Sequence, residues 1–390
     1  PFWPKPQPPA ATLTPAGLAM VAGPAARVAR APGLQRAQAG SLAAAVVGGG
    51  GAQPPPAWPG PGSRPCFAPE GAAVCDARAE LLADLVRNAR GRLACLTGAG
   101  FSTESGVPDY RSPQGSYSKG HKPMRHQEFV KEPSSRARYW ARSLGGWRFF
   151  DAARPNAAHR ALAALEGHGH VAGVVTQNVD RLHQRAGAIN VVDLHGRNDE
   201  VACLGCRRRR PRAGFQLELE AVNAAWIEDF LPQGGAGADV LADGDAHLEV
   251  RDFAGFTVPA CAACGGVWMP RVVFFGGTLD PEVRAAAQQL IDNADGLLVL
   301  GTSCQVFSAF RLVRSAVEAG KPVALVNIGE TRADPLVPSR LRMPLRCGEA
   351  LEALCARLGV ETAPESRAAA RTTPRPAPQA PEAPGAADRG

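Results

Sequence analysis

Four short apolar runs recur along the middle of the chain, and each ends at a small or polar residue. They cover residues 93–96, 170–175, 297–300 and 323–326. Runs of this length that are apolar at nearly every position are typical of parallel strands buried on both faces. We therefore expect these runs to be the strands of one buried sheet.

Segments with apolar residues at helical spacing separate several of these runs. They cover residues 77–88, 156–166, 281–293 and 308–318. The third follows an Asp-Pro pair, which suits a helix start because proline fits the first helical turn. Strands that alternate with helices predict an α/β fold with a Rossmann-like, doubly wound parallel sheet. Ligands of such sheets bind at the carboxyl ends of the strands, which is where this chain carries glycine and polar residues.

Composition separates the two ends of the chain from its middle. Residues 1–75 hold 15 of the 35 prolines, and residues 363–390 hold 6. We therefore predict a folded domain over residues 76–362, a disordered low-complexity segment over 1–75 and a disordered tail over 363–390.

The first 69 residues contain five basic residues and no acid. This composition is typical of an organelle transit peptide, so we expect the mitochondrial matrix, with the cytoplasm as the alternative. A low-complexity extension without a targeting role explains the same composition.

Charge adds little to the picture of the folded domain. The chain has a formal charge of +7, but residues 76–362 carry 34 Lys and Arg against 32 Asp and Glu. A nucleic-acid-binding face is therefore not predicted. The basic run Arg207–Arg210 is interpreted as a solvated surface, with a phosphate-binding patch as the alternative. No stretch of 18 apolar residues occurs, so no membrane span is predicted, and the oligomeric state is left open.

A glycine-rich loop follows the first predicted strand. Gly98-Ala99-Gly100 would let the backbone approach a pyrophosphate and leave N–H groups free to bind it. The dehydrogenase fingerprint requires a third glycine where Thr103 stands and an acid about twenty residues further on, where this chain has Lys119–His121. The loop instead continues to Asp109-Tyr110-Arg111. A dehydrogenase is therefore disfavoured, and a plain strand-to-helix turn with solvated charges is the structural alternative.

Two further polar groups follow apolar runs. Gln177, Asn178 and Asp180 can orient an amide and a sugar through directed hydrogen bonds, although Asp180 could instead cap a helix. His195 follows the run 189–192, and the ordinary near-neutral pKa of histidine makes it the candidate general base.

Two Cys-x-x-Cys pairs predict a metal site. Cys203 and Cys206 are followed, after 54 residues, by Cys261 and Cys264. Four thiolates in this pattern form a closed tetrahedral site for one structural Zn²⁺, whereas two unrelated pairs of reduced cysteines are the alternative. We expect a small zinc-binding module, inserted at about residues 197–270.

Three more segments carry candidate binding groups. Gly301-Thr302-Ser303 and Asn327-Ile328-Gly329 follow consecutive strands and suit an adenosine ribose. The run Arg271–Gly277 is β-branched and aromatic and ends in glycines, so it could offer an edge to an extended peptide; a plain core strand is the alternative.

In this order the motifs resemble the sirtuin family of NAD-dependent protein deacylases over roughly residues 77–360. The matching stretches are GAGFSTESGVPDYR, TQNVDRLH, LHG, the two CxxC pairs, VVFFGG, GTS and NIG. The stretch RARYWARSLGGW (136–147), the Asp-Gly-Asp at 243–245 and the long zinc loop are most similar to class II. That class includes a mitochondrial sirtuin described as an ADP-ribosyltransferase and lipoamidase.

The resemblance implies NAD as co-substrate and acylated lysine side chains of proteins as partners. In the family chemistry, the acyl oxygen attacks the ribose C1′, nicotinamide leaves and an alkylamidate forms. His195 would then act as base on the ribose hydroxyls, moving the acyl group to ADP-ribose, with Asn178 and Asp180 as further catalytic residues. The implied NAD-binding residues are Gly98, Ala99, Gly100, Ser102, Asp109, Tyr110, Arg111, Gln177, Asn178, Val179, Asp180, Gly301, Thr302, Ser303, Asn327, Ile328, Gly329 and Cys347. The implied peptide-binding residues are Val273, Phe274, Phe275, Gly276 and Val306.

The sequence departs from the family pattern in the peptide cleft. Gly277 stands where relatives commonly have an acid or amide, and Arg271 where they often have an acid. Tyr139 and Arg142 have the spacing used by sirtuins that remove acidic acyl groups. The leading function is lysine deacylation; protein ADP-ribosylation at the same NAD site and a non-catalytic NAD-binding regulator are the alternatives.

Overall fold

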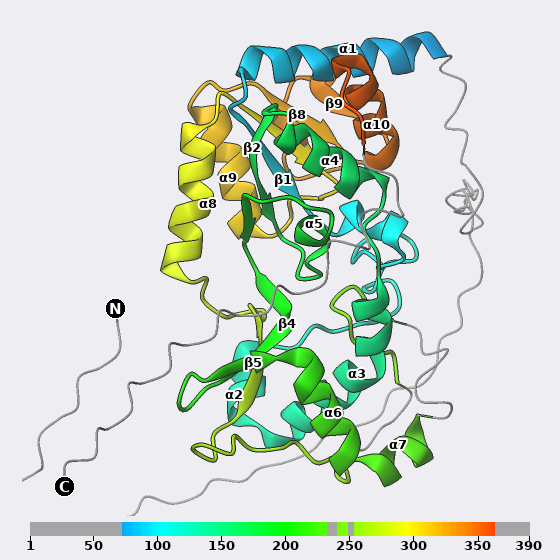
Figure 1. The fold of residues 1–390 in the computed structure, drawn as a ribbon, viewed down its shortest axis with the longest axis vertical. Helices are drawn as coiled ribbons and strands as arrows, with labels where there is room; N and C mark the ends of the chain where they lie inside the picture. Colours follow the sequence, from blue (N-terminus) through cyan, green and yellow to red (C-terminus); the bar gives the residue numbers. More distant parts are fainter. Residues whose placement is uncertain (1–71, 232–239, 249–252, 363–390) are drawn as a thin grey trace, which may run out of the picture. The chain divides into compact units, whose positions relative to one another are not determined.

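The computed structural model describes residues 72–231, 240–248 and 253–362. Within these residues the apolar runs pair into one six-stranded parallel sheet in the order β3-β2-β1-β7-β8-β9 (Figure 1). The strands are β1 (Leu93–Thr97), β2 (Val171–Thr176), β3 (Val191–Asp193), β7 (Gly296–Leu300), β8 (Val323–Val326) and β9 (Arg342–Met343). All four strands expected from the apolar runs are confirmed. The strand order reverses between β1 and β7, and in such sheets this is where ligands bind.

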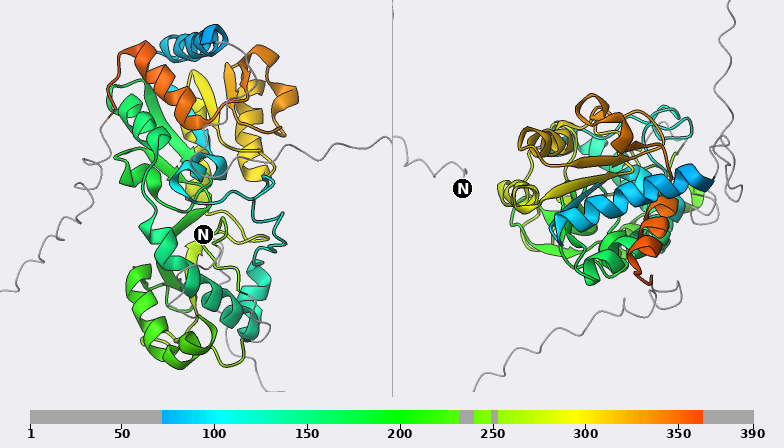
Figure 2. Two further views of the ribbon diagram at one scale, coloured as in Figure 1. Left: turned by 90° about the vertical axis from the view of Figure 1, so that its right-hand side faces the viewer. Right: turned by 90° about the horizontal axis from the view of Figure 1, so that it is seen from above.

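Alternation along each strand divides the core between two helical layers. Leu93 and Cys95 of β1 belong to one apolar cluster, and Ala94 and Leu96 belong to another. The first cluster packs against α1 (Ala72–Ala89), α4 (Ala157–Gly167) and α10 (Cys347–Leu358), and the second against α8 (Pro281–Asn293) and α9 (Phe307–Glu318). Figures 1 and 2 show these two sets of helices on opposite sides of the sheet. The doubly wound fold is confirmed.

Some boundaries differ from the expectation. Helix α1 begins at Ala72, so residues 72–75 are helical and do not belong to a disordered segment. Helix α10 and strand β9 were not predicted. The expected disorder of residues 1–71 and 363–390 lies outside the described residues.

A second, smaller lobe is inserted between the strands of the sheet. Its antiparallel sheet, in the order β5-β4-β6, is formed by β4 (Gly196–Cys203), β5 (Arg209–Pro211) and β6 (Trp268–Val272). Four helices surround it: α2 (His126–Lys131), α3 (Pro133–Ala152), α6 (Arg212–Val222) and α7 (Ala224–Phe230). We call these elements the small lobe.

The small lobe is larger than the predicted zinc module because α2 and α3 share its core. Trp140 of α3 is fully buried, and its ring lies edge-on to Phe215 of α6 with centroids 4.7 Å apart. Phe129 of α2 and Trp268 of β6 belong to the same apolar cluster. Two separate insertions, not the single one expected at residues 197–270, therefore build this lobe.

The remaining described elements are short. The 3₁₀ turns Ala99–Phe101 and Thr103–Ser105 follow β1, and α5 (Leu182–Arg185) follows β2. Two further 3₁₀ turns, Asp334–Leu336 and Ser339–Leu341, precede β9. None of the helices in the part of the chain that the structure describes is both long enough and apolar enough to cross a bilayer.

Two histidines are buried beneath the loop that follows β1. His159 of α4 and His183 of α5 both pack on Phe101, with ring centroids 4.8 and 4.9 Å away. His183 Nε2 lies 2.9 Å from Thr97 Oγ1. Burial lowers the pKa of His183 to about 3 and the pKa of His159 well below its ordinary value.

We predict that these histidines make stability fall as the pH drops below about 6.5. Because their folded pKa lies below the unfolded value, the unfolded chain binds more protons between the two values. From pH 6.5 to 4, His183→Gln should remove about 1.4 kcal/mol per pH unit from this slope, measured by urea unfolding. The exposed His168→Gln is the control, and equal slopes in wild type and His183→Gln would contradict the assignment.

Candidate active site

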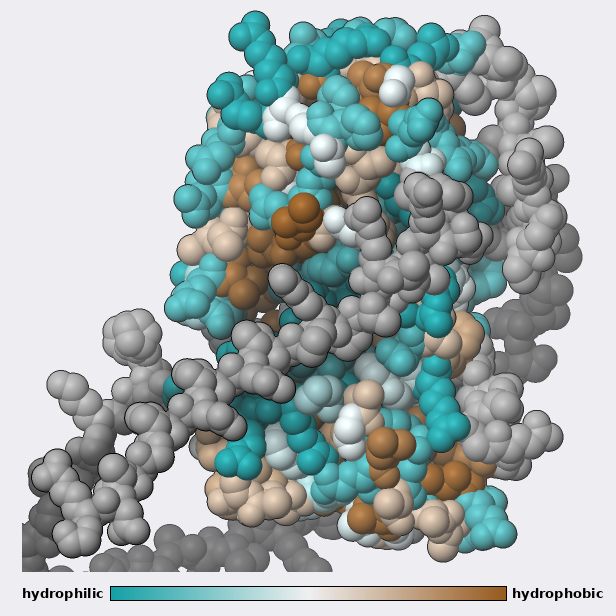
Figure 3. All heavy atoms as spheres, viewed as in Figure 1, coloured by the Kyte–Doolittle hydropathy of each residue, from teal (hydrophilic) through white to brown (hydrophobic). Residues whose placement is uncertain are grey.

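A cavity of about 1270 Å³ lies at the carboxyl ends of the strands. Residues from the loops after β1, β2, β7 and β8 line one side of it, and residues 272–277, which lead out of β6, line the other. Figure 3 shows the described surface hollowed between the sheet and the small lobe, with apolar side chains bordering the hollow. The cavity brings together most of the residues that the sequence singled out.

The glycines of the first loop are required by close packing against another loop of the same chain. A Cβ on Gly98 would lie 2.6 Å from Thr302 Cβ, and one on Gly100 would lie 2.9 Å from the carbonyl oxygen of Gly301. The Gly98 N–H donates to Leu300 O, and the Gly100 N–H donates to Gly301 O. The expectation that these N–H groups are free is therefore wrong. Ala99 and Gly100 line the cavity, but Gly98 lies behind them.

Asp180 both caps a helix and fixes the first loop. Its carboxylate accepts from the Leu182 N–H at 2.9 Å, at the start of α5, and from Ser102 Oγ at 2.7 Å. Burial raises the pKa of Asp180, while these two donors oppose the increase. The bond to Leu182 fits the helix-capping interpretation, and the bond to Ser102 ties Asp180 to the first loop. Neither Asp180 nor Ser102 lines the cavity, so in this structure both contact it only through residues such as Asn178.

Asn178 and Gln177 join the strand ends. Asn178 Nδ2 donates to Gly98 O and to Ser102 Oγ, both at 3.0 Å. Gln177 Nε2 donates to Thr302 Oγ1 at 2.9 Å. Both side chains line the cavity, as does Val179, in agreement with the prediction.

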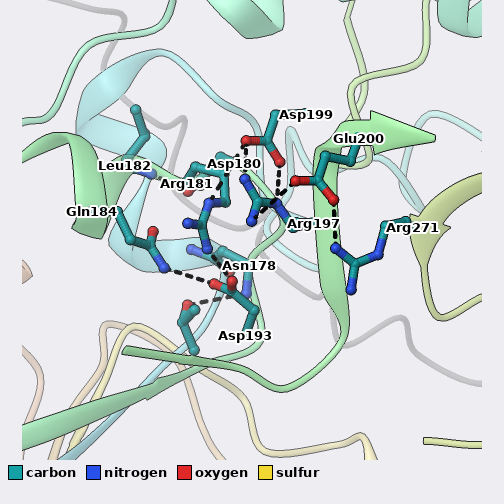
Figure 4. Close-up of polar contacts among 11 residues, drawn as sticks. Asn178, Asp180, Arg181, Leu182, Gln184, Asp193, Arg197, Asp199, Glu200 and Arg271 are labelled. Atoms are coloured by element: carbon teal, nitrogen blue, oxygen red, sulfur yellow. Dashed lines mark hydrogen bonds and ion pairs between the residues drawn. The ribbon is translucent and has the colours of Figure 1, made fainter. Parts of the chain in front are cut away.

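The arginine after Asp180 begins a chain of ion pairs. Arg181 has a left-handed backbone with φ of +64°, and its guanidinium pairs with Asp193. Its Nε also lies 3.9 Å from Asp199 Oδ2 on β4. Figure 4 shows Arg181 between these two carboxylates. The loop after β2 is thus linked electrostatically to the small lobe.

The chain of ion pairs continues to the peptide side of the cavity. Arg197 makes two bonds of 2.5 Å to Asp199 and lies 3.5 Å from Glu200. Arg271 Nη1 donates to Glu200 Oε2 at 2.5 Å (Figure 4). The basic residue at 271 is therefore matched by an acid on the neighbouring strand.

His195 presents one ring nitrogen to the cavity. Its Nδ1 lies 3.2 Å from the Gln177 carbonyl oxygen, so Nδ1 carries the proton of the neutral ring. Its Nε2 lies 2.8 Å from Ser308 Oγ. The following Gly196 lets β4 approach β6, because a Cβ there would lie 2.0 Å from Arg271 O.

The expectation of a near-neutral pKa for His195 is wrong. Burial lowers its pKa to about 4, partly offset by the bond to Gln177. The imidazole is therefore neutral at pH 7 and can accept a proton at Nε2.

Arg111 supplies a cation at the cavity. Its Nη1 lies 3.5 Å from Ser303 Oγ, and its guanidinium lies 5.2 Å from the ring centroid of Tyr117. Asp109 Oδ1 accepts from the N–H groups of Arg111 and Ser112, so it shapes this loop while also lining the cavity. Tyr110 also lines the cavity, and burial raises the pKa of its phenol well above the ordinary value.

The remaining predicted nucleotide-binding residues lie together at the end formed by β7, β8 and α10. The residues there that line the cavity are Gly301, Thr302, Ser303, Asn327, Ile328, Gly329 and Cys347. Asn327 Nδ2 donates to Gly329 O at 2.6 Å. Burial raises the pKa of the Cys347 thiol, so this cysteine is an unreactive wall of the cavity.

The predicted peptide segment is not a core strand. Strand β6 ends at Val272, and the irregular continuation Val273–Gly276 lines the cavity together with Val306. The Val273 N–H donates to His195 O at 2.8 Å, which holds this segment beside the candidate base. Phe307, next to the predicted Val306, also lines the cavity, and so does Asp243, which the sequence marked only as part of the class II resemblance. Sequence reasoning missed Ser308 as a lining residue, since no motif marks it.

Tyr139 and Arg142 both line a second cavity of about 930 Å³, together with Asp245. Tyr139 is buried and lines the main cavity as well, whereas Arg142 does not. The two cavities therefore adjoin at Tyr139, and the cationic group expected for acidic acyl chains lies on the side of the second cavity.

The four predicted zinc ligands form one cluster. Their sulfur atoms all lie within 4.8 Å of one another, with Cys203–Cys264 at 3.5 Å and Cys206–Cys261 at 3.7 Å. A tetrahedral zinc site with Zn–S bonds of about 2.3 Å has sulfur atoms about 3.8 Å apart. Both the donors and their spacing fit one structural zinc ion.

Arg210 of the basic run is part of the small-lobe structure. Its guanidinium pairs with Glu218 and lies 4.8 Å from the ring centroids of Phe215 and Trp268. This residue serves packing and does not belong to a phosphate-binding patch.

The donor set of the cavity suits a dinucleotide: a guanidinium for a pyrophosphate, and amides and hydroxyls for sugars. Comparison with known proteins agrees, because the model of the Sir2 family matches residues 98–308. The chain is 50% identical over 260 residues to "NAD-dependent protein deacetylase 2" of Bradyrhizobium diazoefficiens, covering 67% of this chain and 92% of the relative. It is 48% identical over 269 residues to "NAD-dependent protein deacylase SRT2" of Arabidopsis thaliana, covering 67% of this chain and 71% of the relative.

Solved structures agree with this assignment. A Sir2 complex with deacetylated p53 peptide and 3′-O-acetyl ADP ribose is 29% identical, with a TM-score of 0.57, and the match covers 72% of this chain and 99% of that one. Sir2Tm bound to a propionylated peptide is 28% identical, with a TM-score of 0.56 and the same coverage. This α/β protein with a nucleotide cleft and a four-cysteine module therefore belongs to the Sir2 family, the sirtuins.

We predict one zinc ion per chain, measured by elemental analysis of the purified protein. Cys264→Ser should lose this zinc and unfold the small lobe first, because metal binding contributes to folding. Cys355→Ala, which removes a buried thiol outside the cluster, is the control and should retain zinc. A folded, zinc-free Cys264→Ser variant with full stability would contradict a structural role.

Proposed function

We propose that this protein is an NAD-dependent protein lysine deacylase that releases nicotinamide and transfers the acyl group to ADP-ribose. The observation that carries the proposal is the position of His195. Its ring lines a cavity bordered by the nucleotide-type loops and by residues 273–276, and its neutral Nε2 lies 2.8 Å from the hydroxyl of Ser308, which lines the same cavity. The high identity to deacetylases and a deacylase supports the same activity.

Different residues of the cavity would bind different parts of NAD. Arg111 would hold the pyrophosphate beside the part of the cavity wall formed by Ala99 and Gly100, because a guanidinium favours anions. Asn178 and Gln177 would orient the nicotinamide ribose from the end of β2. Asp180 and Ser102 keep Asn178 in place from behind. Bound NAD supplies the electrophilic ribose carbon and the leaving nicotinamide.

His195 would take the proton from a ribose hydroxyl. Its pKa of about 4 makes the unliganded imidazole neutral but weakly basic. A nearby anion favours the protonated form of a histidine, so bound pyrophosphate would raise this pKa towards the range of an efficient base. The imidazole of His195 would therefore become more basic when NAD is bound.

The acyl preference that we propose is acetyl, with lipoyl as the further candidate. The names of the relatives and the peptides in the solved Sir2 complexes support a small neutral acyl group. The class II resemblance of residues 136–147 motivates the lipoyl group. An acidic acyl group would have to reach Arg142, which lies beside Tyr139 and Asp245 in the adjoining second cavity.

The location that we propose is the mitochondrial matrix, because residues 1–69 have the composition of a transit peptide. The test is to locate a fusion of this segment to a fluorescent protein in cells.

Protein ADP-ribosylation would use the same NAD site, so only the identity of the products separates it from deacylation.

The test is mass spectrometry of the full chain with NAD and peptides bearing acetyl, lipoyl, succinyl or long-chain acyl lysines. Deacylation predicts nicotinamide together with O-acyl-ADP-ribose, most of it from the acetyl or lipoyl peptide. ADP-ribose attached to protein, with acyl peptides intact, would overturn the proposal in favour of transfer to protein. Untouched NAD would overturn it in favour of a non-catalytic regulator.

We predict that His195→Ala lowers the rate of acyl transfer by about 10²–10⁴-fold, the usual contribution of a general base. The formation of O-acyl-ADP-ribose is followed by chromatography, and zinc content and thermal unfolding report the fold. His168→Ala, which removes an exposed histidine, is the control. Wild-type turnover by His195→Ala would contradict the role of His195.

A further inference from the structure

His195, the candidate base, has a second polar partner, Ser308, which belongs to none of the sequence motifs. Ser308 Oγ lies 2.8 Å from His195 Nε2, whereas the other ring nitrogen, Nδ1, lies 3.2 Å from Gln177 O. Because Gln177 O can only accept, Nδ1 is the donor of the neutral ring and Nε2 is an acceptor. The Ser308 hydroxyl therefore donates to the nitrogen that would act as base.

The location of Ser308 makes this bond specific. Ser308 is the second residue of α9, so it lies within the first turn and not at the N-cap position, where a serine would cap the helix. The residue that precedes the helix is Val306, whose side chain makes no cap bond, and Ser308 Oγ bonds to His195 instead. Ser308 and its neighbours Val306 and Phe307 all line the cavity. The start of α9 thus supplies Val306 and Phe307 to the peptide side of the cavity and supplies Ser308 as the partner of His195.

A hydroxyl can serve His195 in both of its protonation states. It donates to Nε2 of the neutral ring and, after rotation, can accept from Nε2–H of the imidazolium. The second bond is stronger, because hydrogen bonds to a charged group are roughly twice as strong as neutral ones. Ser308 should therefore orient the neutral ring and stabilise the charged ring somewhat more.

We propose that Ser308 is a positioning residue for His195 in acyl transfer. This inference rests on the proposed function. Ser308 fixes the ring rotamer together with Gln177 and keeps the pKa of the base from falling further in its buried site. Because it acts through His195, it should affect acyl transfer to the ribose and leave the initial release of nicotinamide nearly unchanged.

The test compares Ser308→Thr with Ser308→Val, two side chains of similar shape of which only threonine has a hydroxyl. Single-turnover experiments with NAD and acetyl-lysine peptide would record nicotinamide and O-acetyl-ADP-ribose from pH 5 to 9. We expect Ser308→Val and Ser308→Ala to slow acyl transfer about five- to tenfold and to move its acid limb to lower pH by about half to one unit. Ser308→Thr should keep the wild-type rate and limb.

One control variant separates this role from a structural one. Ser315→Ala removes a hydroxyl of the same helix that bonds to Gln288 outside the cavity, and it should leave the profile unchanged. Other charged groups that line the cavity, such as Asp109, Arg111, Asp243 and Glu330, are common to all variants, so their titration cancels in the comparison.

The outcomes are distinct. Equal rates and equal acid limbs in Ser308→Val and Ser308→Thr would overturn the inference. Equal loss of nicotinamide release and acyl transfer, with no shift of the limb, would also overturn it in favour of a packing role. Failure of wild type to form O-acetyl-ADP-ribose would instead overturn the proposed function. If Ser308→Ala does not fold, the threonine and valine pair still decides the question.

Discussion

The contact between two backbones at the reversal point of the sheet is the constraint on which the site depends. The loop after β1 and the loop after β7 touch so closely that the Gly100 N–H donates to Gly301 O, and no Cβ fits on Gly98 or Gly100. This contact brings Thr302 within reach of Gln177 and turns Ala99 towards the cavity. The glycines therefore allow the two loops to approach closely, and the residues that line the cavity project from these loops.

Polar side chains behind this contact hold the loops together. Asp180, Ser102 and the half-buried Asn178 form one hydrogen-bonded group that joins the loops after β1 and β2. Asp180 and Ser102 are buried, so each must be satisfied by a partner, since an unpaired buried polar group costs about 1–3 kcal/mol. The ion pairs from Arg181 through Asp199 and Glu200 to Arg271 extend this connection to the peptide side. Arg271, one of the two residues that depart from the family pattern, is thus paired with an acid within the protein.

The sequence was sufficient to predict strands β1, β2, β7 and β8, helices α1, α4, α8 and α9, and the four cysteines. Each of these depends on a local pattern: continuous apolar runs, helical spacing or thiol pairs. It did not predict that α2 and α3 complete the small lobe, since the packing of Trp140 on Phe215 joins segments far apart in the chain. It also did not predict which polar residues of a motif face the ligand. Asp180 and Asn178 are two residues apart, yet only Asn178 lines the cavity.

The chemistry of His195 shows the same limit. Its residue type and its position after a strand indicated a base, but its pKa depends on its burial in the folded protein and on its bond to Gln177. The partner Ser308 comes from a helix start more than a hundred residues later. Residue type is local, whereas protonation state and orientation are tertiary properties.

The most direct test of the account is the stoichiometry of the reaction with NAD and an acetyl-lysine peptide. Nicotinamide, deacetylated peptide and O-acetyl-ADP-ribose should form in equal amounts throughout the time course. Deacetylated peptide with free acetate and unconsumed NAD would contradict the account, because the acyl group would then leave without the nucleotide site.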